Sequence, residues 1–229
     1  MEKLSRKERE YHLRREEILN AAERIFAQKG FHETTVAAIA RESEFSIGTL
    51  YQFFKNKEEL YYTMMIEKFD QLYTMLRQEV DKNHTPLDKL SCLVTGVLSF
   101  IEQNVDFFKI FTWELNVLQP AMEARLKEQL IAKHFSYIRL IGTVVEEGIR
   151  EGVLQEGTVD DYSAALVGMM NLFAFNWILN RQEDSLRTKG AVIINLFLHG
   201  IAARNAPLPL PDMRSGNQNP QMAETIKES

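Results

Sequence analysis

The sequence predicts an all-α protein, and three observations support that prediction. Apolar residues recur at intervals of three and four positions through most of the chain, which is the pattern of amphipathic helices. Ser, Thr or Asn stands before most of these segments, where its side chain can cap a helix N-terminus. No segment alternates apolar and polar residues as a half-buried β-strand does.

Length and cysteine content limit the class of protein. With 229 residues, the chain can form one large domain or two small ones. Cys92 is the only cysteine, so no internal disulfide can form, and a reducing compartment fits this usage. The N-terminus has no apolar signal, and no uninterrupted apolar run reaches the roughly 20 residues of a membrane span. These features predict a soluble cytoplasmic protein without a membrane partner.

The net charge of −5 is unevenly distributed along the chain. Basic and acidic side chains are equal in number over residues 1–60, so the whole deficit lies in the remainder. A neutral N-terminal part on an acidic body can engage a polyanion locally while the body is repelled from it. A chance distribution of solvated charges explains the same numbers equally well.

The first 80 residues predict four helices, two of them very short. The expected helices cover residues 11–29, a short segment from 34 or 35, residues 46–53 and residues 56–80. Gly30 ends the first helix, as glycine commonly does just after a helix C-terminus. Ser46 and Asn56 cap the third and fourth helices, since both side chains accept hydrogen bonds from the first turn.

The remaining helical patterns extend to Arg204. The expected segments are residues 85–103, an aromatic-rich stretch at 104–118, and helices at 121–150, 158–180 and 185–204. Pro86 stands at the first position of its helix, where proline does no harm. The stretch after Arg204 is rich in Pro, Asn and Gly, which predicts a disordered tail.

One short segment combines apolar residues with a glycine, two hydroxylated residues and a tyrosine, which the packing of a core helix does not require. It is Ser46-Ile-Gly-Thr-Leu-Tyr-Gln-Phe-Phe-Lys-Asn-Lys57. Gly48 costs roughly 1 kcal/mol against alanine in a helix interior, which suggests that something approaches the backbone closely. Two short helices joined by a tight turn outline a helix-turn-helix unit, whose second helix lies in the DNA major groove. Ile47, Leu50 and Phe54 are expected to point the same way, and Leu50 and Phe54 to lock this helix onto the first one.

These residues resemble the N-terminal domain of the tetracycline-repressor (TetR) family of bacterial transcription regulators. The resemblance covers about the first 60 residues and rests on spaced elements that match in order: Ile18-Leu-Asn-Ala-Ala-Glu-Arg-Ile-Phe-Ala27, Gly30-Phe31, Thr34-Thr-Val-Ala-Ala-Ile-Ala40, Gly48-Thr-Leu-Tyr51, Phe54-Lys55 and Lys57-Glu-Glu-Leu60. Residues 146–154 resemble the family's C-terminal half more weakly. The family often has Tyr-His where this chain has Gln52-Phe53, so contacts at that point are not carried over.

The resemblance implies a homodimeric repressor that binds a palindromic DNA operator and releases it when a small-molecule effector binds. It implies a helix-turn-helix DNA-binding domain at residues 1–56, a helical ligand-binding and dimerisation domain at 57–205, and a disordered tail at 206–229. Ligand binding is expected to reposition the fourth helix and so alter the spacing of the two recognition helices.

The resemblance also implies which side chains contact DNA. Phosphate contacts are expected from Thr34 or Thr35, Tyr51, Lys55 and Lys57. Base contacts are expected from Ser46, Thr49 and Gln52, beside the close backbone approach at Gly48. Gln52 is the preferred sequence reader, because glutamine can pair bidentately with adenine.

The segment from Tyr162 to Leu179 is apolar nearly all round, which predicts cover on two sides. The core covers one side, and a second subunit is the natural cover for the other, with residues 191–203 alongside. The candidate effector contacts are Phe107, Phe111, Trp113, Met122, Tyr137, Asn171 and Phe175. Aromatic residues and methionines at helical spacing are more often simply core. A large hydrophobic or aromatic effector is expected.

The sequence predicts no metal site, cofactor or catalytic residue. The five histidines lie on separate segments without metal-ligand spacing, and neither a phosphate-cradling glycine loop nor a nucleophile elbow is present. The alternative function is a helical small-molecule binding protein or enzyme with a vestigial helix-turn-helix. For the charged residues from Lys3 to Arg15, a solvated, frayed terminus is favoured over an arm in the minor groove.

Overall fold

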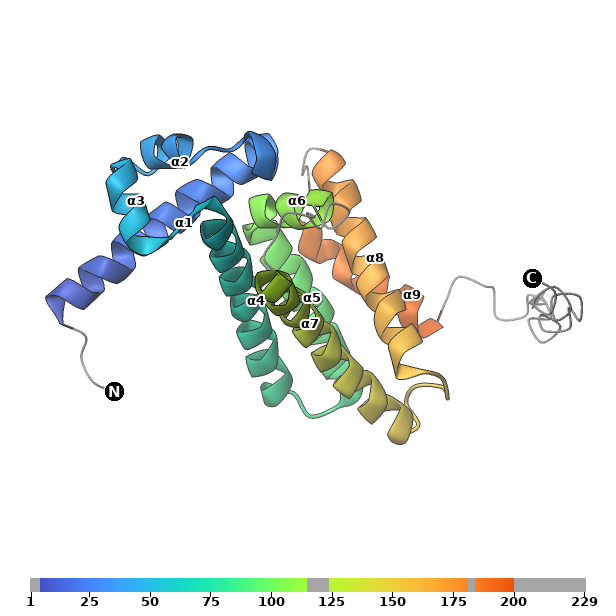
Figure 1. The fold of residues 1–229 in the computed structure, drawn as a ribbon. Helices are drawn as coiled ribbons and strands as arrows, with labels where there is room; N and C mark the ends of the chain where they lie inside the picture. The colour runs from blue at the N-terminus through green and yellow to red at the C-terminus, as the bar shows by residue number, and fades with distance from the viewer. Residues whose placement is uncertain (1–4, 115–123, 181–183, 200–229) are drawn as a thin grey trace, which may run out of the picture. The chain divides into compact units, whose positions relative to one another are not determined.

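The computed structural model describes residues 5–114, 124–180 and 184–199, and within these ranges the regular structure is entirely helical. The α-helices are α1 (Arg6–Glu33), α2 (Val36–Glu42), α3 (Ile47–Phe53), α4 (Lys57–Lys82), α5 (Pro86–Gln103), α6 (Val105–Glu114), α7 (Ala124–Arg150), α8 (Val159–Leu179) and α9 (Lys189–His199). A short 3₁₀ helix, η2 (Leu186–Thr188), precedes α9. The predicted all-α fold is confirmed (Figure 1).

The first helix begins at Arg6 rather than at Tyr11. Ser5 Oγ accepts a hydrogen bond from Glu8 N at 3.2 Å, and Ser5 N donates to the Glu8 carboxylate at 2.8 Å. This reciprocal capping box satisfies two backbone donors and so stabilises a helix start. From Arg6 onward the predicted fraying is therefore wrong, whereas the side chains of residues 5–14 are exposed to solvent as predicted.

The backbone of α1 changes conformation at Gly30, where the predicted helix ends. Gly30 has a φ of 74°, a left-handed conformation that favours glycine. The Thr34 hydroxyl then donates a hydrogen bond to the Gly30 carbonyl at 2.7 Å. These two residues fix the path of the chain from α1 into α2.

The first three helices pack around side chains of α1. Ile18, Ala22 and Phe26 are buried on one face of that helix, as their spacing predicts. From α3, Leu50 and Phe54 are buried in the same core. The opposite face of α3 is therefore left free of the core.

The later helices form a bundle in which α4 packs against α5 and α7, and α7 packs against α8 (Figure 1). α1 packs against both α4 and α6, so residues up to Leu198 form one compact unit. The last predicted helix starts at Lys189, because η2 occupies the preceding residues. The predicted end of that helix at Arg204 and the predicted tail lie outside the described residues.

Candidate functional site

The α3 helix divides its side chains between the core and solvent. Leu50 is 1% exposed and Phe54 is also buried, whereas Tyr51 is 54% exposed and Gln52 is exposed as well. The helix therefore has one buried face and one exposed face, and the prediction for Ile47 is wrong, because it is 45% exposed and does not share the buried face with Leu50. The exposed face carries the residues that the sequence assigns to DNA, so this helix can present them to a duplex.

The first turn of α3 is held by its own hydroxyl groups. Ser46 Oγ accepts a hydrogen bond from Thr49 N at 3.0 Å, which is the expected helix cap. The two side-chain hydroxyls of Ser46 and Thr49 lie 2.8 Å apart. Two of the three predicted base contacts, Ser46 and Thr49, thus have a structural role in this helix as well.

Gly48 is exposed, and the packing of the chain does not require a glycine there. A Cβ built on Gly48 would meet only Ser46 Oγ, at 3.7 Å. Its backbone also lacks the positive φ seen at Gly30 and Gly152. Because glycine weakens a helix, a requirement for it at this position has to come from outside the fold.

The pair of threonines before α2 occupies two different environments. Thr34 is 1% exposed, and its hydroxyl donates a hydrogen bond to the Gly30 carbonyl. Thr35 is exposed and caps α2, accepting a hydrogen bond from Ala38 N at 3.2 Å. Of the two alternatives for a phosphate contact, the geometry favours Thr35.

The two lysines after α3 also differ. Lys55 is exposed, whereas the Lys57 ammonium donates to the carbonyls of Phe31 at 2.7 Å and Thr34 at 2.8 Å. It also lies 4.3 Å from the centre of the Phe31 ring, a cation–π distance. Lys57 therefore joins the start of α4 to the end of α1, a role that sequence reasoning missed.

A cluster of aromatic rings and one imidazole fills the space between α4, α5, α6 and α7. The ring cluster consists of Phe69, Phe100, Phe107, Phe111, His134 and Tyr137, whose neighbouring ring centres lie 4.8 to 6.2 Å apart. Three of the predicted effector contacts, Phe107, Phe111 and Tyr137, come together in it and are buried. Sequence reasoning missed Phe69 and His134, which come from helices far apart in the chain.

Two polar groups of the ring cluster are strongly affected by burial. Desolvation lowers the pKa of His134 to about 4, so the imidazole is neutral at pH 7. Among the described residues, no group forms a hydrogen bond with the buried Nδ1 atom of His134. Burial also raises the pKa of the Tyr137 hydroxyl far above its usual value. The cluster therefore offers uncharged polar atoms inside an apolar environment.

The other predicted effector contacts do not join the ring cluster. Phe175 is 37% exposed on α8, beside Leu172 and Leu179, which are 60% and 61% exposed. Asn171 is half-buried on the same helix. The Trp113 side chain and Met122 lie outside the described residues. Phe175 instead belongs to an exposed apolar stripe along α8.

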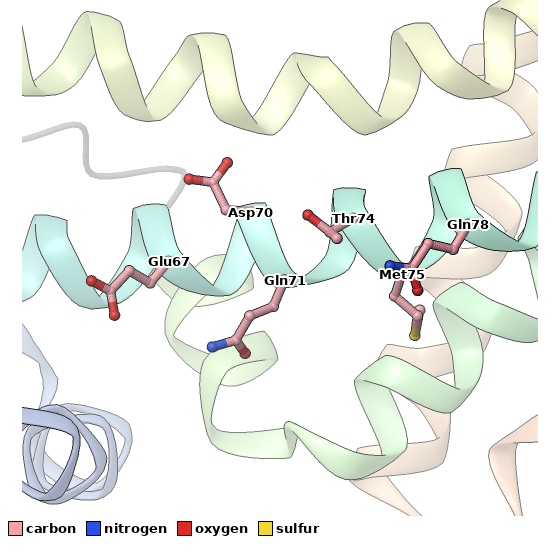
Figure 2. A pocket seen from close by; sticks show the side chains of 6 residues that line it. All are labelled: Glu67, Asp70, Gln71, Thr74, Met75 and Gln78. Atoms are coloured by element: carbon pink, nitrogen blue, oxygen red, sulfur yellow. The ribbon is translucent and has the colours of Figure 1, made fainter. Parts of the chain in front are cut away.

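An open surface hollow of 540 Å³ lies along α4, at positions that the sequence did not single out. Figure 2 shows the α4 hollow and the side chains that line it, Glu67, Asp70, Gln71, Thr74, Met75 and Gln78. Asp70 points towards α7, where Lys133 Nζ lies 2.5 Å from its carboxylate. Glu67 likewise pairs with Arg15 at 2.5 Å. The remaining polar groups of the α4 hollow are uncharged.

Metal centres and membrane spans are two other features that bear on function. Across residues 5–114, 124–180 and 184–199, no three His, Cys, Asp or Glu side chains come together as metal ligands would. In these ranges α8 has the length and composition of a membrane span, but its Leu166, Met170 and Trp177 pack into the core. A core helix of a bundle has the same composition.

A helix-turn-helix with an exposed recognition face, joined to a helical bundle with a buried apolar cluster, defines a DNA-binding transcriptional regulator. The family comparisons agree with this class. The model of bacterial regulatory proteins of the tetR family matches residues 18–62, and that of the tetracyclin repressor-like C-terminal domain matches residues 83–200. The chain belongs to the tetR family, and it is a ligand-responsive regulator of transcription.

Three relatives illustrate the similarity. The fatty acid metabolism regulator protein of Bacillus subtilis is 25% identical over 186 residues, which is 81% of this chain and 94% of that protein. The transcriptional repressor KstR2 of Mycobacterium tuberculosis is 31% identical over 144 residues, or 61% of this chain and 68% of KstR2. The crystal structure of FadR from Bacillus subtilis in complex with stearoyl-CoA shares the fold, with a TM-score of 0.71 and 23% identity over 82% of this chain and 99% of FadR.

Proposed function

We propose that the protein is a cytoplasmic, homodimeric repressor that releases a palindromic operator when a long-chain acyl-CoA binds its C-terminal domain. The observation that carries this proposal is the match to the Bacillus subtilis fatty acid metabolism regulator over 94% of that protein, so that both functional parts are included. A related regulator has been crystallised with stearoyl-CoA. An effector of this class is large and mostly hydrophobic, as the sequence predicts.

The chemistry of the C-terminal domain supports an acyl-CoA. An acyl chain requires apolar surroundings, which the buried rings of the ring cluster supply. The pantetheine arm of coenzyme A carries amides, which pair with uncharged donors and acceptors such as Gln71, Thr74 and Gln78 of the α4 hollow. The carboxylates beside them are already paired with cations, which reduces their repulsion of an anionic ligand.

The exposed face of α3 supports operator binding. Gln52 and Tyr51 stand out from the surface next to Gly48, where no side chain separates the backbone from a partner. A glutamine amide can read adenine in the major groove, and the tyrosine hydroxyl can reach a phosphate. Thr35 and Lys55 are exposed near both ends of the helix-turn-helix and suit further phosphate contacts.

The apolar stripe on α8 supports a dimer. Leu172, Phe175 and Leu179 follow each other at intervals of three and four residues, and Val192 adds an exposed apolar side chain on α9. This spacing places the three side chains on one helix face, as in helices that pair across an interface. Two chains are also needed to bind two half-sites about 34–36 Å apart.

Fluorescence anisotropy with a labelled fragment of the protein's own promoter tests the proposal. We expect specific binding that survives competitor DNA, and release on addition of palmitoyl-CoA but not of free coenzyme A. Release by a ketosteroid instead would assign the effector to another class, since the related KstR2 is a ketosteroid transcriptional regulator. Absence of specific binding, together with turnover of the ligand, would favour the alternative of an enzyme with a vestigial helix-turn-helix.

The dimer is tested with a single substitution on α8. Leu172→Glu places a charge in the apolar stripe, which opposes burial against a second copy. We expect the variant to sediment as a monomer and to lose cooperative operator binding, with an unchanged helical circular dichroism spectrum. Glu146→Gln, at an exposed position on α7, serves as the control and should remain dimeric. A wild-type protein that is monomeric at micromolar concentration contradicts the proposal.

A further inference from the structure

A buried carboxylate lies on α1, at the place where this helix meets the C-terminal bundle. Glu23 is 8% exposed, and Lys68 Nζ on α4 lies 3.0 Å from its Oε2 atom. The same ammonium donates a hydrogen bond to Asn104 Oδ1 at 2.7 Å. One ammonium group therefore connects α1, α4 and the joint between α5 and α6.

Asn104 is the single residue between α5 and α6, and both helix ends hold it. Its backbone N–H and its side-chain Nδ2 donate to the Phe100 carbonyl, at 2.9 and 2.8 Å. Its own carbonyl accepts a hydrogen bond from Phe108 N at 3.1 Å in the first turn of α6. The amide of Asn104 therefore follows any change in the angle between these helices.

The α5–α6 joint borders the ring cluster. Phe100 lies before the joint and Phe107 after it, with their ring centres 6.1 Å apart. Phe107 in turn lies 5.2 Å from Phe69, which follows Lys68 directly on α4. An acyl chain that enters among these rings has to displace them, and the displacement acts on the residues at both ends of the Lys68–Asn104 hydrogen bond.

The charge of Glu23 makes α1 sensitive to such a displacement. A buried carboxylate is unfavourable unless a cation pairs with it at short distance and with good geometry. Lys68 provides this pairing, and its ammonium keeps its place partly because Asn104 accepts its second hydrogen bond. Movement of the joint therefore alters the environment of a charge on the helix that carries α2 and α3.

We propose that Glu23, Lys68 and Asn104 transmit effector binding to the operator-binding helices, with Lys68 and Asn104 as positioning residues. The inference rests on the proposed function for the identity of the effector. Allostery requires two distinct sites and a contact that differs between the free and effector-bound states, and the proposal assigns that role to the Lys68–Asn104 hydrogen bond.

The decisive measurement compares Asn104→Ala with Asn104→Asp. The coupling factor is the operator Kd at saturating palmitoyl-CoA divided by the operator Kd without it. Asn104→Ala keeps both partners of the Glu23–Lys68 pair but removes its connection to the joint, so we expect the coupling factor to fall on the order of 10-fold. Asn104→Asp retains an oxygen that accepts the Lys68 hydrogen bond but loses the Nδ2 donor to the Phe100 carbonyl, so its coupling factor is expected to stay closer to the wild type than that of Asn104→Ala.

Lys89→Met provides the matched control. The Lys89–Glu147 ion pair also joins two helices, α5 and α7, at 2.7 Å, but none of its described contacts reaches α1 or the α5–α6 joint. We expect the coupling factor of this variant to equal that of the wild type. The proposal is overturned if Asn104→Ala keeps the wild-type factor, or if Lys89→Met lowers it to the same extent as Asn104→Ala.

Hydrogen exchange provides a second readout that needs no effector. In the free protein, Asn104→Ala should accelerate exchange of the α1 amides around Glu23 on the order of 10-fold, because their local opening becomes easier. Lys89→Met, which removes an ion pair between α5 and α7, should leave exchange in this stretch of α1 unchanged. If palmitoyl-CoA does not release the wild-type protein from DNA, the proposed effector is wrong. The exchange rates then test by themselves whether Asn104 acts on α1 through Lys68 and Glu23. Unchanged exchange in Asn104→Ala would then overturn this link.

Discussion

The helix-turn-helix and the C-terminal bundle place their candidate functional residues in opposite environments. On α3, the candidate DNA contact Tyr51 is exposed, while the neighbouring Leu50 holds the helix in the core. In the bundle, the candidate effector contacts Phe107, Phe111 and Tyr137 are themselves core residues. On α3 the candidate contacts Tyr51 and Gln52 therefore lie outside the core, although Ser46 and Thr49 also hold the first turn of the helix, whereas the three effector contacts are part of the core. Substitutions should separate stability from binding on α3 but not in the ring cluster.

The largest change in the free energy of unfolding is expected from Leu50→Ala. This substitution removes a fully buried side chain and leaves a cavity, which should lower the free energy of unfolding by about 2–5 kcal/mol. Ile47→Ala, on the exposed face of the same helix, should change it by less than about 1 kcal/mol. Urea titrations of both variants measure the difference. Equal losses would show that α3 is not divided into a core face and a free face.

A pH titration tests the polar side of the ring cluster. His134 has a folded-state pKa of about 4 against an ordinary value of 6.5, so the unfolded chain binds a proton that the folded chain rejects. Stability from this residue is complete above pH 6.5 and is lost as the pH falls towards 4, by at most about 3 kcal/mol.

The control for this titration is His134→Phe, which cannot take up the proton. Its free energy of unfolding should decline less steeply between pH 6.5 and pH 4 than that of the wild type. Parallel curves for the two proteins would mean that the imidazole is solvated.

Gln52→Ala sharpens the comparison on the DNA side. The side chain is exposed, so its loss should leave the unfolding transition within about 0.5 kcal/mol of wild type. Loss of a bidentate base contact should reduce discrimination at one operator position by about 1–3 kcal/mol. Binding to a set of single-base operator variants reveals this change. An equal loss of affinity on every sequence would show that Gln52 does not read a base.

The two lysines after α3 should respond in different ways to the same change. Lys57→Met removes the hydrogen bonds to the Phe31 and Thr34 carbonyls, which should lower the unfolding free energy by about 1–2 kcal/mol. Lys55→Met should leave stability unchanged but reduce the salt dependence of operator binding by about one unit. Thermal melts and anisotropy at several salt concentrations measure both effects. If Lys57→Met changed only the salt dependence of operator binding, the contacts of Lys57 with α1 would not contribute to stability.

The buried and exposed faces of α3 could largely be predicted from the sequence, because the residues that indicate them are close together in the chain. The serine cap, the spacing of Leu50 and Phe54, and the uncommon Gly48 all lie within one short segment. The same kind of signal was available for the start of α1. Ser5 with Glu8 three positions later is a capping box, and reading it would have placed the helix start at Arg6.

The missed roles depend on residues that are distant in the sequence. Lys57 finds its carbonyl partners at the end of α1, more than 20 positions earlier, and nothing in the segment around Lys57 indicates them. In the ring cluster, Phe69 and His134 meet only because α4 packs against α7. Periodicity predicts that such residues are buried, but not which of them come together.

Gly48→Ala tests the central claim, that the outward face of α3 contacts DNA closely while its inward face only holds the helix. The new Cβ would have open space in the protein, with Ser46 Oγ as its nearest neighbour at 3.7 Å. Alanine is also the better helix former, so the free energy of unfolding should rise by up to about 1 kcal/mol.

The same variant should bind the operator more weakly, because the added methyl group occupies space that a bound duplex needs. The most direct measurement is therefore operator affinity and unfolding free energy on one preparation of Gly48→Ala beside the wild type. We expect stability to increase and affinity to decrease, a combination that misfolding cannot produce. Operator affinity equal to that of the wild type would contradict a close approach of DNA to this helix.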